Sequence, residues 1–236
     1  MKLVISSSEL LKGILTVSKA IPAKSTEAIL EDYLFVLEGD KLEVTASDKE
    51  ITMKTVITVD CTEEEGRFAV PARQLNDLLK ELPDQPITIS TISENQFKCA
   101  WASGESTLPY FNPDDYPESQ TTGDDANVVE FPGQSLADGI GRTLYASSDE
   151  ENRPVMNSIF FDITPNSTTL VASDLQKLTC YTADDVKAEV PCSFILNKRH
   201  AAVLKSVIGK DVENVTIKFD SKVAIFSFDN TTIICC

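Results

Sequence analysis

The sequence has a single histidine among its 236 residues, and none of its six cysteines shows CxxC spacing. A zinc site needs clustered His or Cys ligands, and a Ser-His-Asp or Cys-His arrangement would have to use His200, which follows Lys198 and Arg199 at an expected helix start. The sequence also lacks the GxGxxG and GxxxxGK[ST] loops that cradle phosphates in nucleotide-binding enzymes. It therefore predicts a non-enzymatic protein with no catalytic residue, no metal site and no cofactor.

Long apolar runs are absent as well. No stretch approaches the 18 or so residues that a membrane span needs, and Glu9 and Lys12 interrupt the N-terminal segment where a signal peptide would be uniformly apolar. We therefore expect a cytoplasmic chain without membrane contact, in which the cysteines are free or buried thiols. Three Asn-x-Ser/Thr triplets, at Asn166, Asn214 and Asn230, leave a secreted β-rich binding module as an alternative.

Positive charge is scarce. Lys and Arg together number 21 against 37 Asp and Glu, so the formal net charge is −16. Domains that coat nucleic acid with their whole surface are usually basic, and this balance excludes that class. A small basic patch within an acidic surface remains compatible with the composition. The apolar content of 42% is enough for a folded core.

The chain contains an internal repeat. Residues 34–52 resemble residues 158–179, and both segments pass through Ala-Ser-Asp, which ends at Asp48 in the first and at Asp174 in the second. These two aspartates are 126 residues apart. A fixed offset that holds along much of a chain indicates two copies of one structural unit.

The arginines follow the same offset. Arg73 and Arg199 each come 25 residues after the Asp of their copy. The intervening segment at about 112–127 is rich in Pro, Asp, Ser and Thr and lacks apolar periodicity, as expected of a linker. We predict one domain over 1–118, which includes the start of this linker, and a second over 128–236.

Each copy mixes two kinds of apolar periodicity. Strict alternation predicts strands, and apolar residues three and four apart predict helices. Each copy therefore reads as a strand, a helix, several strands, a second helix and further strands. The strands are joined too closely for parallel crossovers, so we predict an α+β fold with two helices packed on antiparallel sheets in each copy. The expected helices cover 8–18, 71–82, 134–146 and 198–208.

One expected strand carries the only tryptophan. Phe97, Cys99 and Trp101 alternate with polar residues in QFKCAW. Alternate side chains lie on one face of a strand, so we expect all three to be buried.

The expected helices gather the cations. They hold eight bases and four acids, a balance of about +4, which leaves about −20 for the rest of the chain. Bases of this kind can simply cover solvated helix faces; if the helices lie side by side, they instead form a positive strip suited to phosphate contact without base reading. The bases are Lys12, Lys19, Arg73, Lys80, Arg142, Lys198, Arg199 and Lys205, and the acids are Glu9, Asp77, Glu81 and Asp138.

From Met1 to about Ile234 the sequence resembles the bacterial DNA polymerase III beta subunit, the sliding clamp of DNA replication. The motifs that carry the resemblance are MKLVIS, TEAIL, LEVTASDKEI, VPAR and STLPYFNPDDYP in the first copy, and RPVMNSIFF, LVASDLQKL and FILNKRHAAVL in the second. The resemblance implies a ring of repeated domains whose helices face a central channel. Duplex DNA threads this channel, and the ring acts as a processivity factor that tethers the polymerase.

The resemblance also implies functional residues and partners. Channel-lining contacts with DNA would fall on Lys24, Arg73, Arg153, Lys198 and Arg199. A second site would accept peptides of DNA polymerase III and of the clamp loader. In this chain Leu-Gln-Lys stands where many members have Gly-His-Arg. The peptide site would map to Met156, Ser173, Leu175, Gln176, Lys177 and Leu178.

Family members carry three copies of the unit, whereas only two are recognisable in this sequence. We expect the third domain, and with it half of the peptide site, to be absent. Two readings follow. The chain can be a shortened clamp that does not close in the usual way, or three two-copy chains can associate into a ring of six domains.

Overall fold

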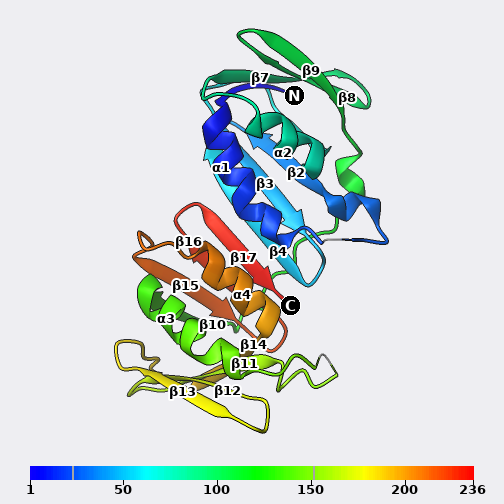
Figure 1. Cartoon of the computed structure of the whole chain (residues 1–236). Coiled ribbons are helices and arrows are strands. Elements are labelled where there is room, and N and C mark those ends of the chain that lie inside the picture. Colours follow the sequence, from blue (N-terminus) through cyan, green and yellow to red (C-terminus); the bar gives the residue numbers. More distant parts are fainter. Residues whose placement is uncertain (23, 151) are drawn as a thin grey trace. The chain divides into compact units, whose positions relative to one another are not determined.

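The computed structural model describes residues 1–22, 24–150 and 152–236, and it divides the chain into two compact units (Figure 1). Unit 1 spans Met1–Ser119 and unit 2 spans Gln120–Cys236. Both units combine two helices with antiparallel sheets, which confirms the expected α+β fold class of tandem copies.

Unit 1 has the predicted order of strand, helix, strands, helix and strands. Strands β5, β1, β7, β8 and β9 form one sheet in that order, and β4, β3, β2 and β6 follow one another in the other sheet. The elements are β1 (Lys2–Ser6), α1 (Ser7–Val17), η1 (Ser18–Ala20), η2 (Ala28–Glu31), β2 (Asp32–Glu38), β3 (Lys41–Ser47), β4 (Ile51–Thr58), β5 (Cys61–Glu64), β6 (Gly66–Pro71), α2 (Ala72–Lys80), β7 (Pro86–Ser93), β8 (Gln96–Trp101), β9 (Gly104–Pro109) and η3 (Pro113–Asp115).

Unit 2 repeats this order. Strands β13, β12, β11 and β14 form one sheet, and β10, β15, β16 and β17 follow one another in the other. The elements are β10 (Asn127–Pro132), α3 (Gly133–Thr143), η4 (Leu144–Ala146), β11 (Ser158–Ile163), β12 (Thr168–Ser173), β13 (Leu178–Ala183), β14 (Cys192–Asn197), α4 (Lys198–Val207), β15 (Asn214–Phe219), β16 (Ala224–Phe228) and β17 (Thr231–Cys235).

Helix α1 shows why the helices form and how they are oriented. The Ser6 side chain caps its start by accepting a hydrogen bond from the backbone N–H of Glu9. Leu10 and Ile14 are fully buried against the sheet, where α1 packs on β3 and β4. The opposite face is left to solvent and carries Lys12. In each unit the two helices also pack on each other, α1 on α2 and α3 on α4 (Figure 1).

Aromatic rings fill the centre of each core. In unit 1, Phe68 of β6 contacts Phe35, Phe97 and Tyr110 with ring centroids 5.2–5.7 Å apart. In unit 2 the rings of Phe161 and Phe194 stack at 4.5 Å, and Phe194 also contacts Phe219 and Phe226. Aromatic contacts of this kind add to the stability that burial of the rings provides.

The expectation for Trp101 is wrong in part. Phe97 and Cys99 are fully buried, but Trp101, at the end of β8, remains partly exposed. Trp101 pairs across the strands with Gly104, and a Cβ added at Gly104 would lie 3.2 Å from the indole ring. The ring therefore covers a glycine at the sheet edge instead of entering the core.

The repeat of the sequence is also a repeat of structure. Arg73 is the second residue of α2, and Arg199 is the second residue of α4. Gly13 and Gly139 are both the seventh residue of their helices, and both are buried. Among the described helices, none is long and apolar enough to cross a membrane.

Two glycines of α3 give a stability test. A Cβ at Gly133 would lie 2.3 Å from the backbone oxygen of Val212, whereas the atoms nearest to a Cβ at Gly141 belong to the end of the flexible Lys205 side chain, the first at 3.0 Å. We expect Gly133→Ala to lower the free energy of unfolding by about 1–3 kcal/mol through overpacking. Gly141→Ala should leave it unchanged or raise it by up to about 1 kcal/mol, because alanine favours the helix. Urea unfolding of both variants checks this, and equal effects would contradict it.

Candidate functional site

The helices of unit 1 present three cations to solvent. Lys12 lies on α1, and Arg73 and Lys80 lie seven residues apart on one face of α2. The opposite face of α2 is anchored by Leu75 and Leu79, which are buried. Because α1 and α2 pack on each other, the three bases belong to neighbouring helices of one unit. The sequence predicts Lys19 on the same helix as Lys12. The structure differs, because α1 ends at Val17 and Lys19 lies in the 3-10 turn η1.

The helices of unit 2 also present three cations, of which Arg199 is equivalent to Arg73. Arg142 on α3 and both Arg199 and Lys205 on α4 are exposed. The guanidinium of Arg142 lies over the ring of Tyr181, 5.8 Å from its centroid, which orients the side chain without neutralising it. Lys205 reaches across to α3, where its Nζ lies near Gly141.

Lys198 and Arg153 are engaged within unit 2. The half-buried Lys198 donates from Nζ to the backbone oxygen of Ser147 at 3.0 Å and to Asp149 at 2.6 Å. The hydrogen bond and the positive charge of Lys198 hold the pKa of Asp149 below its usual range. Arg153 forms an ion pair with Glu150 at 3.2 Å. Lys198 therefore ties a loop to the start of α4, a local role that the sequence did not indicate.

Several of the other predicted DNA-binding bases have no carboxylate partner among the described residues. Lys12, Arg73, Lys80 and Lys205, together with Lys24 in the bend after Pro22, take part in no ion pair within the described part of the chain. Several bases on strands and loops are paired with carboxylates, whereas Lys41, Lys187 and Lys222 are exposed and form no ion pair in the described part of the chain. Such ion pairs join Lys2 to Glu63, Lys49 to Glu27, Lys54 to Glu43, Arg67 to Asp114, Lys98 to Glu105 and Lys177 to Asp174.

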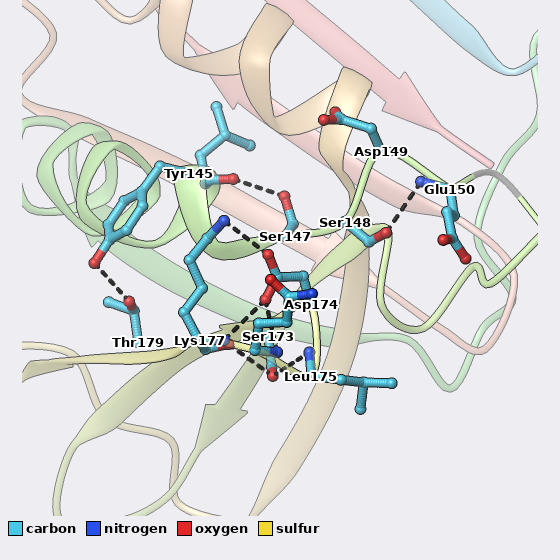
Figure 2. A network of polar contacts seen from close by, with 12 residues as sticks. Tyr145, Ser147, Ser148, Asp149, Glu150, Ser173, Asp174, Leu175, Lys177 and Thr179 are labelled. Carbon is cyan, nitrogen blue, oxygen red and sulfur yellow. Dashed lines mark hydrogen bonds and ion pairs between the residues drawn. The ribbon is translucent and has the colours of Figure 1, made fainter.

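The predicted peptide site lies around the turn between β12 and β13 (Figure 2). Asp174 Oδ1 accepts the backbone N–H groups of Gln176 and Lys177, and Ser173 Oγ accepts that of Leu175. The hydrogen bond with the Lys177 side chain, and then those with the backbone, lower the pKa of Asp174 to about 2. Leu175 has φ +74°, in the left-handed region that favours glycine.

The equivalent turn of unit 1, between β3 and β4, has the same construction. Asp48 Oδ1 accepts the N–H groups of Glu50 and Ile51, Ser47 Oγ accepts that of Lys49, and Lys49 has φ +78°. The repeated Ala-Ser-Asp motif is therefore a turn in which two side chains satisfy the backbone.

The turn of unit 2 differs in what it exposes. Leu175 and Leu178 are each 67% exposed, so ordinary strand packing does not account for them. Tyr145 is also exposed, and its hydroxyl bonds to Thr179 at 2.8 Å beside the turn, while the Leu175 side chain points away from this polar network (Figure 2). Of the remaining predicted residues, Gln176 is exposed and Met156 is half-buried.

A cavity of about 870 Å³ in unit 1 was not expected from the sequence. Its wall includes Arg73 and Lys80 of α2 and the carboxylate of Asp32, the first residue of β2. Asp32 is only 5% exposed, and burial, with a smaller contribution from the charge of Glu31, raises its pKa to about 6. An acid at the start of a strand gives little signal in a sequence, because such positions are usually solvated.

Residues 1–120 match the model of the family described as DNA polymerase III beta subunit, N-terminal domain. The chain is 29% identical over 187 residues to the beta sliding clamp of Halalkalibacterium halodurans, covering 75% of this chain and 48% of that protein. It is 28% identical over 226 residues to the beta sliding clamp of Staphylococcus aureus, covering 92% of this chain and 59% of that protein.

Solved structures show the same fold. A putative DNA polymerase III beta subunit from Eubacterium rectale superposes with a TM-score of 0.93 at 24% identity, and a sliding clamp from Pseudomonas aeruginosa bound to griselimycin does so with 0.93 at 22%. Both matches cover 100% of this chain and 64% of the other. The chain thus spans about half to three fifths of the length of the relatives named above.

Asp32 gives a prediction for stability against pH. A carboxyl group whose pKa is higher in the folded than in the unfolded protein destabilises the fold when ionised, so its cost is full above about pH 6 and vanishes below about pH 4. We expect Asp32→Asn to raise the free energy of unfolding by roughly 1–2 kcal/mol at pH 8 and to leave it unchanged near pH 3.5. Urea unfolding across this range checks it, and a difference independent of pH would contradict it.

Proposed function

Because the chain belongs to the DNA polymerase III beta subunit family, we propose that it acts as a sliding-clamp module, which holds duplex DNA without reading its sequence and supports processive DNA synthesis. The proposed role is binding and not catalysis. We place it in the cytoplasm, the compartment of bacterial DNA replication. We include self-association of the chain, since a ring around a duplex requires more copies of the unit than two.

One observation carries the DNA-binding proposal. In a chain of net charge −16, four helix bases stay exposed and take part in no ion pair in the described part of the chain, whereas seven bases on strands and loops are paired with carboxylates; the four are Lys12, Arg73, Lys80 and Lys205. An exposed cation already paired with a carboxylate has little left to offer a phosphate, whereas an unpaired one releases counterions from DNA when it binds. The helix faces are therefore the surfaces best suited to an anionic partner.

The number and spacing of these bases suit weak, non-specific contact. Sequence reading requires side chains inserted into a groove and bonded to base edges, whereas exposed lysines and arginines on helix faces suit contact with phosphates. Such contacts are strongly salt-dependent, and non-specific affinities of this kind lie at about 10⁻⁴–10⁻⁶ M. The acidic remainder of the surface repels DNA, which would confine the contact to the helices.

We further propose that the turn at Asp174 forms part of a docking site for peptides of the polymerase and of the clamp loader. Leu175 and Leu178 supply exposed apolar area, and Tyr145 supplies an aromatic surface with its hydroxyl held by Thr179. Exposed apolar side chains clustered on a surface commonly mark sites of protein interaction. The hydrogen bonds of Ser173 and Asp174 hold the turn rigid, which lowers the entropic cost of binding.

The DNA contact is tested by charge reversal on the helices. A variant carrying Lys12→Glu, Arg73→Glu and Lys205→Glu should bind a DNA duplex at least about tenfold more weakly, and its salt slope should fall by about three units. Fluorescence anisotropy with two duplexes of unrelated sequence, each over a range of salt, measures both quantities. The loss should be equal for the two duplexes.

The matched control reverses three exposed bases outside the four helices. Lys41→Glu, Lys187→Glu and Lys222→Glu change the net charge by the same amount as the helix variant. We expect the control to retain most of the affinity. If both variants lost affinity equally, the effect would come from net charge, and the helix faces would not be the site. Lys198 is left unchanged because it holds the loop at Ser147.

The peptide site is tested with griselimycin, the ligand of the Pseudomonas aeruginosa clamp, and we propose that it binds at this turn. We expect Leu175→Gly to raise the free energy of unfolding by about 1 kcal/mol, because glycine relieves the left-handed backbone. The same substitution should weaken griselimycin binding, because it removes exposed apolar area. Calorimetric titration and urea unfolding give the two readouts.

Val190→Gly is the control for that titration, since Val190 is a comparably exposed apolar residue of unit 2, 71% exposed, away from the turn. It should leave griselimycin binding unchanged. Equal weakening by the two substitutions, or no weakening by Leu175→Gly, would show that the turn does not contribute to the site.

A further inference from the structure

The carboxylate of Asp32 lies in the wall of the cavity in unit 1 and has no partner among the described residues. Its side chain forms no hydrogen bond or ion pair in the described part of the chain, although Asp32 is only 5% exposed. Burying a carboxylate without a compensating cation or donor is costly, and proteins usually pair such groups. The pKa of about 6 still leaves the group ionised at neutral pH. The cavity therefore presents a partly desolvated negative charge.

The fold itself does not require this acid. The equivalent position of the second copy is Ser158, the first residue of β11, whose hydroxyl donates to the backbone oxygen of Pro154 at 2.6 Å. The same strand start is thus built with a small, satisfied side chain in unit 2. An unsatisfied carboxylate in unit 1 adds cost without adding a contact to the fold.

The remaining wall of the cavity indicates the class of ligand. Ile21, Ile29 and Phe111 give it apolar surface, and Phe111 is 49% exposed. A volume of about 870 Å³ is within the range of small-molecule sites. Magnesium and calcium ions require several oxygen ligands at once, and the described residues hold no group of three or more acidic, His or Cys side chains placed to bind a metal ion. An alkyl chain that ends in a cation fits both the apolar wall and the carboxylate of Asp32.

The other charged groups of the wall are compatible with this ligand. Glu31, Asp77 and Asp115 add three carboxylates, against the two bases Arg73 and Lys80. With Asp32 ionised, the wall carries more negative than positive charge. A cationic ligand is therefore favoured over an anionic one.

We propose that this cavity is a binding site for an organic cation, in which an ammonium or guanidinium group pairs with Asp32 and its alkyl chain lies along Ile21, Ile29 and Phe111. The cation can come from a free amine or from a Lys or Arg side chain of another polypeptide. The proposal does not depend on DNA binding, because the site lies in unit 1 alone and its test uses no DNA.

The experiment is a titration of the whole chain, followed by NMR chemical shifts and by calorimetry. The probes are n-butylamine, agmatine, and two alanine-rich hexapeptides that contain a single Lys or a single Arg. We expect saturable binding of at least one probe with a Kd below about 10 mM, with shifts at Ile29 and Phe111. 1-Butanol, which has the chain without the charge, should bind more weakly. If only the free amines bind, the cation comes from a small molecule; if only the peptides bind, it comes from a Lys or Arg side chain of another polypeptide.

Asp32→Asn should reduce the affinity at least about tenfold, since it removes the charged partner of the ligand. Asp115→Asn removes the same charge from the wall of the same cavity but not the buried group, and it should change the affinity by less than about twofold. Equal effects of the two substitutions, or no saturable binding by any probe, would overturn the proposal. Either outcome would leave the DNA-binding proposal intact.

Discussion

A cation is available to an external anion only where the fold keeps carboxylates away from it. This constraint is severe in a chain with 37 acidic and 21 basic side chains, because a base on the surface usually has an acid within reach. The strands and loops show the usual outcome, as in the pairs Lys54–Glu43 and Arg67–Asp114. On the helix faces, Lys12, Arg73, Lys80 and Lys205 take part in no ion pair in the described part of the chain, and the proposed function depends on them.

The helices meet this constraint through their packing. Each helix buries one apolar face on the sheets and contacts the other helix of its unit, so only its outer face meets solvent. The four helices carry three acids, Glu9, Asp77 and Asp138, against seven bases. The same packing that builds the core thus leaves Lys12, Arg73, Lys80 and Lys205 accessible.

Much of this could be predicted from the sequence. Repetition, apolar periodicity and turn motifs are local signals, and they gave the order of elements, the equivalence of Arg73 and Arg199, and the helix charge. What the sequence could not give depends on contacts between distant residues. The hydrogen bond from Lys198 to the backbone oxygen of Ser147 and the burial of Asp32 both depend on such contacts. Trp101 follows the alternation of its strand, but its position at the end of β8 leaves it partly exposed.

The two Ser-Asp turns have a consequence for sequence variation. A residue with positive φ in a tight turn is usually glycine. Here three hydrogen bonds from backbone N–H groups to side chains hold each turn around Lys49 or Leu175. The conformation is thus maintained by the neighbours, and the residue at the tip can change its chemistry without loss of the turn. One copy of the unit can in this way present a charged tip and the other an apolar tip, so that duplicated domains diverge in their partners while keeping one backbone.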